Sequence, residues 1–388
     1  MALSCTRLKV GTSAKTAAVN RAHPGLVDPG LPGLPGLEAL TSTIRELNPG
    51  QPFRLADPRE EGLAQMVPTG LVSTVQEDLD GIEQAVSLGR PGAVRPLTAV
   101  DAGVVKLGVM PNGVVGAARA AAITYFPDGR RVLRTYRPGI FAITSENKLT
   151  LFHSMGAALG KPDFYVKVDS AGRAIAEKMP MGPHDHRLLD RCRNLLERLV
   201  QRQLSAELED GLMALDGALT VRTYDTPGTF LRKLRESCHE RRVSLVAVSK
   251  QTGLTIKGVD IRLLLDGETG LPGRRRLTKA FKEEAKSGAE RTLGDLYVVR
   301  FAPGGATYRV DVAQEPGLRS GALLDEFAGS CLHRSGYPEP LIEAHAYSYM
   351  PPPIVAQLQA HAVVRYGLDV RPEPNLGPVF APFGGRYK

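Results

Sequence analysis

Two aspartates each follow a short apolar run and are themselves followed by small residues. Asp101 lies between "LTAV" and "AG", and Asp216 lies between "LMAL" and "GA". If the two runs are neighbouring strands, their carboxylates meet at one edge of a sheet and repel each other unless a cation joins them. Hard oxygen ligands suit Mn²⁺ or Mg²⁺, and such a site can hydrolyse a phosphodiester. The alternative is that both residues belong to ordinary turns.

A third carboxylate is expected from the helix between these two strands. Glu197 lies in "LLERL", inside the apolar-periodic stretch, whereas Glu207 and Glu209 lie near its end in "SAELEDG". We favour Glu197 over Glu207, although a glutamate on such a helix is often only a solvated surface residue. Lys250 ends the run "LVAVSK" and could contact a phosphate. His345, in "LIEAHAY", could complete a metal shell through a neutral ring nitrogen. The alternatives are a solvent-exposed strand end for Lys250 and a surface or core histidine for His345.

The elements that would position these residues form an α/β pattern. Strands are expected at 97–110, 113–126 and 130–136, with the turn "PDG" before the third, which gives an antiparallel meander. A helix follows over 185–205, then a strand over 211–221, a helix over 226–242 and a strand over 243–250. Strand, helix and strand in this order favour parallel pairing. The pattern predicts a mixed sheet flanked by helices.

The pattern extends to both ends of the chain. A hairpin around "PGG" (303–305) and helices at about 319–334 and 351–366 are expected late in the sequence, and an amphipathic helix over 73–88 early in it. Residues 25–38 are rich in proline and glycine, which predicts irregular structure. We therefore divide the 388 residues into an N-terminal extension, 1–94, that packs on or reaches away from the core, and one domain, 95–388.

Composition narrows the class of protein. The net charge of +8 and the pI of about 9.3 suit a polyanion such as DNA, with "RKLRESCHERR" (232–242) and "RRR" (274–276) as candidate contacts; a basic surface without a ligand is the alternative. The four cysteines are far apart and predict reduced thiols of a cytoplasmic protein rather than a zinc ribbon. We find no signal peptide and no apolar run long enough for a membrane helix. The sequence also has no GxxxxGK[ST] and no GxSxG motif, so nucleotide hydrolysis and serine hydrolase chemistry are not expected.

Four segments, taken in order, resemble the NurA nuclease family. They are "AVDAG" (99–103), "ALDGAL" (214–219), "LVAVSKQT" (245–252) and "GYPEPLIEAH" (336–345). Family members look like Asp-Gly-Ser at the first segment and Asp-Gly-Ser-Leu at the second. They carry a hydrophobic strand ending in Ser-Lys at the third segment, and Tyr-Pro followed by Ala-His at the fourth. The resemblance covers roughly residues 95–370.

This resemblance implies an RNase H-like core and a manganese-dependent 5′-to-3′ DNA exonuclease that also cuts single strands internally. It implies a homodimer docked on a hexameric HerA ATPase and a role in end resection during double-strand break repair. Carried over to this chain, Asp101 and Asp216 become metal ligands, Glu197 the helix carboxylate, His345 the C-terminal metal ligand and Lys250 a phosphate contact.

Two rival functions remain open. The serine of the family pattern is missing after both Asp101 and Asp216, which favours a weakened module that docks an ATPase or DNA without cutting. A different enzyme on an RNase H-like fold, such as an RNA-cleaving or guide-dependent nuclease, is the second. Loss of function on replacing Asp101 would argue against the first, and cleavage of matched DNA and RNA strands separates the second.

Overall fold

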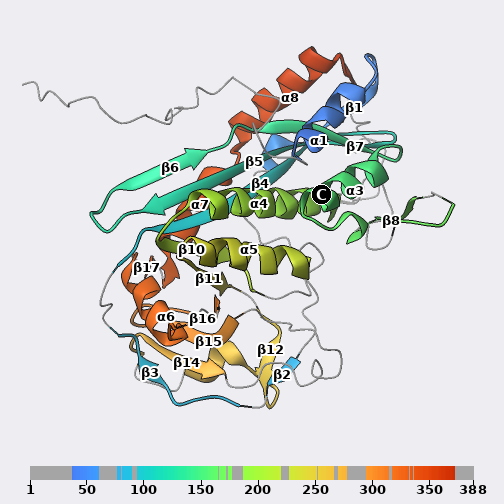
Figure 1. The fold of residues 1–388 in the computed structure, drawn as a ribbon. Helices are drawn as coiled ribbons and strands as arrows, with labels where there is room; N and C mark the ends of the chain where they lie inside the picture. Colours follow the sequence, from blue (N-terminus) through green and yellow to red (C-terminus); the bar gives the residue numbers. More distant parts are fainter. Residues whose placement is uncertain are drawn as a thin grey trace, which may run out of the picture.

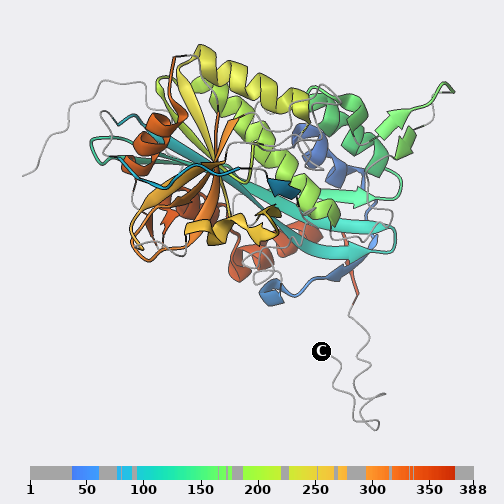
Figure 2. The same cartoon turned by 90° about the horizontal axis from the view of Figure 1, so that it is seen from below.

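The computed structural model describes most of the chain from residue 37 to residue 371. The described residues are 37–60, 77–79, 81–89, 94–164, 166–171, 174–176, 187–219, 227–250, 252–265, 270–277, 294–313, 317–331, 333–334 and 336–371. Within them, twelve strands form one large sheet, with helices on both of its faces (Figures 1 and 2). The predicted α/β class, a mixed sheet flanked by helices, is confirmed.

An antiparallel meander forms one half of the sheet. Its strands are β4 (Leu97–Met110), β5 (Gly113–Tyr125), β6 (Arg131–Thr135) and β7 (Gly139–Thr144). β5 pairs with β4 along its whole length, and its other edge pairs with β6 and then β7. The long arm formed by β4, β5 and β6 projects beyond the helices in Figure 1. The expected three-strand meander is therefore present, with β7 as an additional strand.

A parallel unit continues the sheet from the other edge of β4. It consists of α4 (Arg187–Glu207), β10 (Gly211–Asp216), α5 (Gly228–Glu240) and β11 (Val243–Ser249). β10 lies parallel to both β4 and β11, as expected for a strand, helix and strand crossover. The spatial order β7-β5-β4-β10-β11, with three antiparallel strands followed by two parallel strands, is that of an RNase H-like core.

Antiparallel strands extend the sheet beyond β11. They are β16 (Thr307–Ala313), β15 (Gly294–Arg300), β14 (Gly273–Leu277) and β3 (Val86–Ser87), in spatial order. β15 and β16 form the hairpin predicted around 303–305. Smaller elements lie beside this part of the sheet: β2 (Glu77–Leu79), β12 (Leu254–Ile256), β13 (Val259–Asp260) and η3 (Ile261–Leu265).

The two faces of the sheet bury different hydrophobic clusters. Val100 and Leu215 face α4 and α5, whereas Ala99 and Ala214 face α6 (Ser320–Gly329) and α7 (Glu339–Ser348). Successive residues of a strand point to opposite faces, and both strands are buried on both sides. Burial on both sides explains why β4 and β10 are almost continuously apolar and why the single Asp of each strand stands out in the sequence.

Residues near the N-terminus of the described chain pack on the far end of β4. β1 (Pro52–Leu55) pairs with β4 and with β19 (Asp369–Val370), and α8 (Pro352–Tyr366) covers this end. Leu40 and Phe53 are fully buried. The remaining elements are α1 (Leu37–Ser42), η1 (Thr43–Glu46), α3 (Lys148–Ala158), η2 (Pro162–Phe164), β8 (Val166–Val168), β9 (Ala174–Ala176), β17 (His333–Arg334) and β18 (Tyr337–Pro338). Residues 37–55 thus pack on the core, whereas the irregular segment expected at 25–38 lies almost wholly outside the described residues.

Two expected helices differ from the structure. Within 73–88, the described residues contain the strands β2 and β3 instead of an amphipathic helix, because their backbones pair with β12 and β14. The helix expected over 319–334 ends at Gly329, and the chain then enters the β17–β18 hairpin. Helices α3 and α7 were not predicted from the sequence.

Cys192, Cys238 and Cys331 are free thiols in the part of the chain that the structure describes. None of the described helices combines the length and the apolar character needed to span a bilayer.

Candidate active site

Asp101 and Asp216 are brought together by the register of β4 and β10. The parallel pairing runs as far as Leu215 beside Val100, and the two aspartates are the next residues of their strands. Both belong to the face that α6 and α7 cover, because they alternate with the residues buried against α4. β10 ends at Asp216 while β4 continues to Met110, so the carboxylates lie where a neighbouring strand stops.

Asp101 is held by two residues of α7. Its Oδ2 lies 2.7 Å from His345 Nδ1 and accepts a hydrogen bond of 3.0 Å from Ser348 Oγ. The Asp101 side chain is 12% exposed, whereas the His345 side chain is 46% exposed. The hydrogen bond to Asp101 raises the pKa of His345 above its ordinary value, although burial opposes the rise. One ring nitrogen of His345 therefore holds the carboxylate, and Nε2 is left for a further contact.

Asp216 contacts a lysine and a buried tyrosine. Lys250 Nζ donates to Asp216 Oδ2 at 2.8 Å, and the Tyr337 hydroxyl donates to Asp216 Oδ1 at 3.2 Å. Lys250 Nζ also lies 4.8 Å from the centre of the Tyr337 ring. Burial and the charge of Asp216 raise the pKa of Tyr337 well above its usual range, so this hydroxyl remains a donor. The structure thus places Lys250 beside Asp216, at the strand end where the sequence predicts it.

Glu197 comes from α4 and is almost completely buried. It accepts hydrogen bonds from Gln201 Nε2 at 2.7 Å and Arg198 Nη1 at 3.2 Å. Burial raises its pKa to about 7; the positive charge of Arg198 opposes the rise, while the negative charges of Asp101 and Asp216 add to it. The negative charges of Asp101 and Asp216 therefore reach Glu197.

The two alternative glutamates lie elsewhere. Glu207 forms an ion pair with Arg134 at the surface, and Glu209 lies 3.6 Å from Arg242. Neither is among the largest influences on the pKa of Glu197 or His345. Of the candidates that the sequence offered, the structure joins Asp101 to His345 and Asp216 to Lys250, and both aspartates influence the charge of Glu197.

The donor atoms of this cluster suit a hard divalent cation. Asp101 Oδ1 and Glu197 Oε2 accept no hydrogen bond from the described residues, so each has an oxygen left for an ion. Carboxylate oxygens are the preferred ligands of Mg²⁺ and Mn²⁺. No group of three or more His, Cys, Asp or Glu side chains in the described chain is already arranged to hold a metal ion. The Lys250 ammonium instead neutralises Asp216.

Several residues that shape the site were not identified from the sequence. Tyr337 lies in "GYPEP", which was used only as a marker of resemblance, and Ser348 lies one helical turn beyond His345. The spacing of three residues between His345 and Ser348 puts both on one face of a helix. This spacing is a signal that prediction of α7 would have revealed.

Comparison with known proteins gives matches among solved structures only. No protein-family model matches the chain, and no curated protein matches its sequence. The NurA nuclease of Sulfolobus solfataricus is similar over 73% of this chain and 87% of its own, with 14% identity and a TM-score of 0.44. A NurA bound to dAMP and manganese is similar over 67% and 85%, with 12% identity and a TM-score of 0.35. Endonuclease V of Ciona intestinalis is similar over 67% and 89%, with 14% identity and a TM-score of 0.34. Solved NurA nucleases are thus among the structures that this chain resembles.

Proposed function

We propose that this chain is a metal-dependent deoxyribonuclease that hydrolyses phosphodiester bonds at Asp101, Glu197 and Asp216. One observation supports the proposal: Asp101 and Asp216 occupy the next positions after paired residues of β4 and β10, and their negative charges act on the buried Glu197 of α4, which has a pKa of about 7. Such a cluster of acids is unfavourable in itself and becomes favourable when a cation joins it. The residues that would hold Mn²⁺ or Mg²⁺ are Asp101, Asp216 and Glu197. His345 lies beside them, in contact with Asp101.

Each side chain has a part in the proposed reaction. A bound divalent ion would act as a Lewis acid on the phosphate. His345, fixed through Nδ1 by Asp101, presents Nε2 as the group that exchanges a proton with the attacking water or the leaving oxygen. Lys250 supplies positive charge for the phosphate oxygens, and Tyr337 orients Asp216.

A direct test uses end-labelled single- and double-stranded DNA with Mn²⁺, Mg²⁺ or EDTA. We expect cutting that EDTA abolishes and that Asp101→Asn or Asp216→Asn lowers by at least roughly 100-fold, since even the outer-shell partners of metal ligands are worth about 10–100-fold. Asp369→Asn, on exposed β19, is the matched control and should cut normally. Absence of cutting by the unmodified chain, alone and with a HerA-type ATPase, would overturn the proposal.

The finer assignment rests on the four ordered motifs of the sequence. We propose 5′-to-3′ exonuclease and single-strand endonuclease activities, a homodimer that works in the cytoplasm with a HerA-type hexameric ATPase, and a role in DNA end resection and break repair. Label position on the DNA substrate gives the polarity, and size-exclusion chromatography with light scattering gives the oligomeric state. Release of label from the 3′ end first would contradict the proposed polarity.

A docking module without catalysis is the second candidate. The ion pair between Lys250 and Asp216 favours it, because a lysine that neutralises the carboxylate removes the need for a metal ion. This candidate predicts that Asp101→Asn binds DNA or the ATPase as well as the unmodified chain does and that neither protein cuts DNA. Comparison of DNA with an RNA strand of the same sequence tests the remaining alternative, an RNA-cleaving enzyme.

A further inference from the structure

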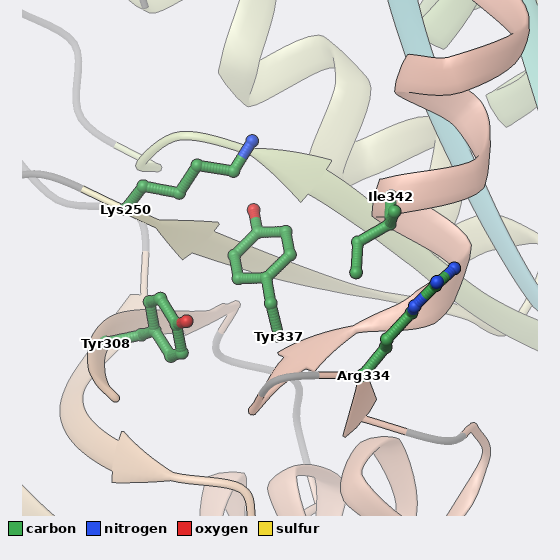
Figure 3. A pocket seen from close by; sticks show the side chains of 5 residues that line it. All are labelled: Lys250, Tyr308, Arg334, Tyr337 and Ile342. Atoms are coloured by element: carbon green, nitrogen blue, oxygen red, sulfur yellow. The ribbon is translucent and has the colours of Figure 1, made fainter. Parts of the chain in front are cut away.

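A pocket of about 350 Å³ opens beside the carboxylate cluster. Five residues from five elements line it: Lys250 after β11, Tyr308 on β16, Arg334 on β17, Tyr337 on β18 and Ile342 on α7 (Figure 3). Figure 3 shows Lys250 and Arg334 on opposite sides, with Tyr337 and Ile342 between them. Of these five residues, only Lys250 is a candidate site residue from the sequence.

The pocket is continuous with the proposed active site. Its wall includes Lys250 and Tyr337, the two side chains that hydrogen-bond to Asp216, at 2.8 and 3.2 Å. A molecule that contacts Lys250 from within the pocket therefore lies beside the Asp216 carboxylate. Lys250 is the only one of the five lining residues previously assigned a phosphate-binding role.

The lining combines positive charge with aromatic and aliphatic surface. The rings of Tyr308 and Tyr337 meet edge to face, with centroids 5.0 Å apart at 67°, and Ile342 adds branched aliphatic surface. Within the described chain, Arg334 has no acidic partner within 4 Å, and no acidic residue lines the pocket. The guanidinium of Arg334 is therefore available for an anionic ligand, and arginine matches phosphate geometry well.

We propose that this pocket holds one nucleotide of the substrate strand next to the bond that is cut. The nucleotide's own phosphate contacts Arg334, the phosphate at the bond that is cut contacts Lys250 on the Asp216 side, and the sugar and base lie against Tyr308 and Ile342. Aromatic side chains that support bases and cations that follow the backbone are the usual means of holding a single strand. The volume is near the lower end of the roughly 300–1,000 Å³ of small-molecule sites, which suits one nucleotide rather than a duplex. The assignment to a substrate strand rests on the proposed nuclease function.

Calorimetric titration of the full chain in EDTA tests the pocket without cleavage, with dTMP, thymidine and inorganic phosphate as probes. We expect dTMP to bind more tightly than thymidine, which lacks the phosphate, and more tightly than inorganic phosphate, which lacks the nucleoside. Arg334→Met should weaken dTMP binding roughly tenfold, the size expected for loss of one hydrogen bond to a charged group. Tyr308→Leu should weaken it too, while Tyr308→Phe keeps the ring and the affinity. Arg365→Met, on the exposed surface of α8, removes the same charge elsewhere and should have no effect.

The pocket proposal and the nuclease proposal can be overturned separately. If the chain cuts DNA but Arg334→Met binds dTMP as tightly as Arg365→Met does, the pocket proposal is overturned and the nuclease proposal stands. If dTMP binds with the expected dependence on Arg334 and Tyr308 but no DNA is cut, the pocket holds a nucleotide and the nuclease proposal is overturned. Equal affinity for dTMP and thymidine also overturns the proposal, because it excludes a phosphate contact.

Discussion

Burial makes the negative charge of Glu197 unfavourable. It lies on the apolar side of α4 beside the fully buried Leu196, where water cannot stabilise its carboxylate. Its donors, Arg198 and Gln201, offset only part of that cost, since its pKa is still about 7. A rise of the pKa from its ordinary value of 4.5 corresponds to on the order of 3 kcal/mol of unfavourable free energy for the ionised form. The ionised Glu197 therefore lowers the stability of the fold unless a cation or another partner binds it.

Replacement of Glu197 tests this burden. Between the unfolded value of 4.5 and the folded value of about 7, the unfolded chain loses the Glu197 proton while the folded chain keeps it, so stability falls as pH rises. Glu197→Gln removes that loss, and in EDTA at pH 8 its free energy of unfolding should exceed that of the unmodified chain by about 1–3 kcal/mol. At pH 5 the advantage should be largely gone. Urea unfolding at both pH values measures it.

The matched control is Glu207→Gln at the exposed end of the same helix. Its partner is the surface residue Arg134, so the change should cost less than about 1 kcal/mol at either pH. A Glu197→Gln variant that is less stable than the unmodified chain at pH 8 would contradict the burial argument.

Binding of a divalent ion at the carboxylates should stabilise the folded chain. A ligand that binds only the folded chain stabilises it by about 2.7 kcal/mol at 100 times its dissociation constant. We expect Mn²⁺ to raise the melting temperature of the unmodified chain at pH 8 and to raise that of Asp101→Asn or Asp216→Asn much less. Thermal unfolding with increasing Mn²⁺ measures this effect without any nucleic acid. An equal shift in all three proteins would mean that the ion binds elsewhere.

At the scale of the residue, the sequence singles out a polar side chain where it interrupts an apolar strand. Asp101 and Asp216 stand out because their strands are buried on both faces. Tyr337 and Ser348 do not stand out, because a tyrosine near a turn and a serine in a helix are common. The Tyr337 contact depends on where β18 lies beside the end of β10, and the Ser348 contact on how α7 packs across β4, which no local pattern records.

At the scale of the element, the loop after β10 determines where Asp216 points. Ser249 Oγ donates to the Gly217 carbonyl at 2.6 Å, and the Leu219 amide donates to Asp311 Oδ2 at 2.8 Å. Asp311 is fully buried and also accepts two hydrogen bonds of 2.8 Å from Arg309. Neighbouring strands thus fix both sides of the loop, and Ser249 places a hydroxyl against it although the serine of the family pattern is missing.

Gly217 makes this loop possible, because its φ of +118° is unfavourable for any residue with a side chain. Gly129, in the β5–β6 turn, has a φ of +83° and is the matched control, since an added Cβ meets no atom within 4 Å at either position. Gly217→Ala and Gly129→Ala should each cost roughly 1–3 kcal/mol of stability. Only Gly217→Ala should lower the cleavage rate. Melting curves and DNA cleavage rates of the two variants measure the difference, and equal activity would contradict a positioning role for the loop.

Elements were predictable where hydrophobic periodicity was long. α4 and the strands of the core were expected with nearly their observed bounds because each buries a continuous apolar face. The expected helix over 73–88 was wrong. Its apolar residues have helical spacing, but the backbone there pairs with the edges of two sheets, and this pairing decides the structure. Helix α7 was missed because its ten residues begin with Glu-Pro and bury only one narrow side.

At the scale of the whole molecule, only some of the basic residues are without acidic partners and so available to bind an anion. The net charge of +8 arises from 49 Lys and Arg against 41 Asp and Glu. Arg274 pairs with Asp325, and Arg276 pairs with Asp295 at 2.9 Å, so much of the "RRR" segment on β14 is already neutralised. On α5, Arg232 and Arg235 have no acidic partner within 4 Å among the described residues. The crossover places the beginning of α5 at the same end of the sheet as Asp216, the end of β10.

This distribution predicts which basic segment binds the DNA backbone. For single-stranded DNA, each neutralised phosphate contributes about 0.7 to the slope of log affinity against log salt concentration. Arg232→Met should therefore reduce the slope by about 0.7 and weaken binding equally for all sequences, because a phosphate contact carries no sequence information. Arg276→Met should leave the slope nearly unchanged, since its charge is engaged by Asp295. Fluorescence anisotropy of labelled oligonucleotides over a range of NaCl concentrations, in EDTA to prevent cutting, gives both slopes. If Arg276→Met changes the salt slope more than Arg232→Met does, the DNA lies along β14 instead, on the side of the sheet away from α5.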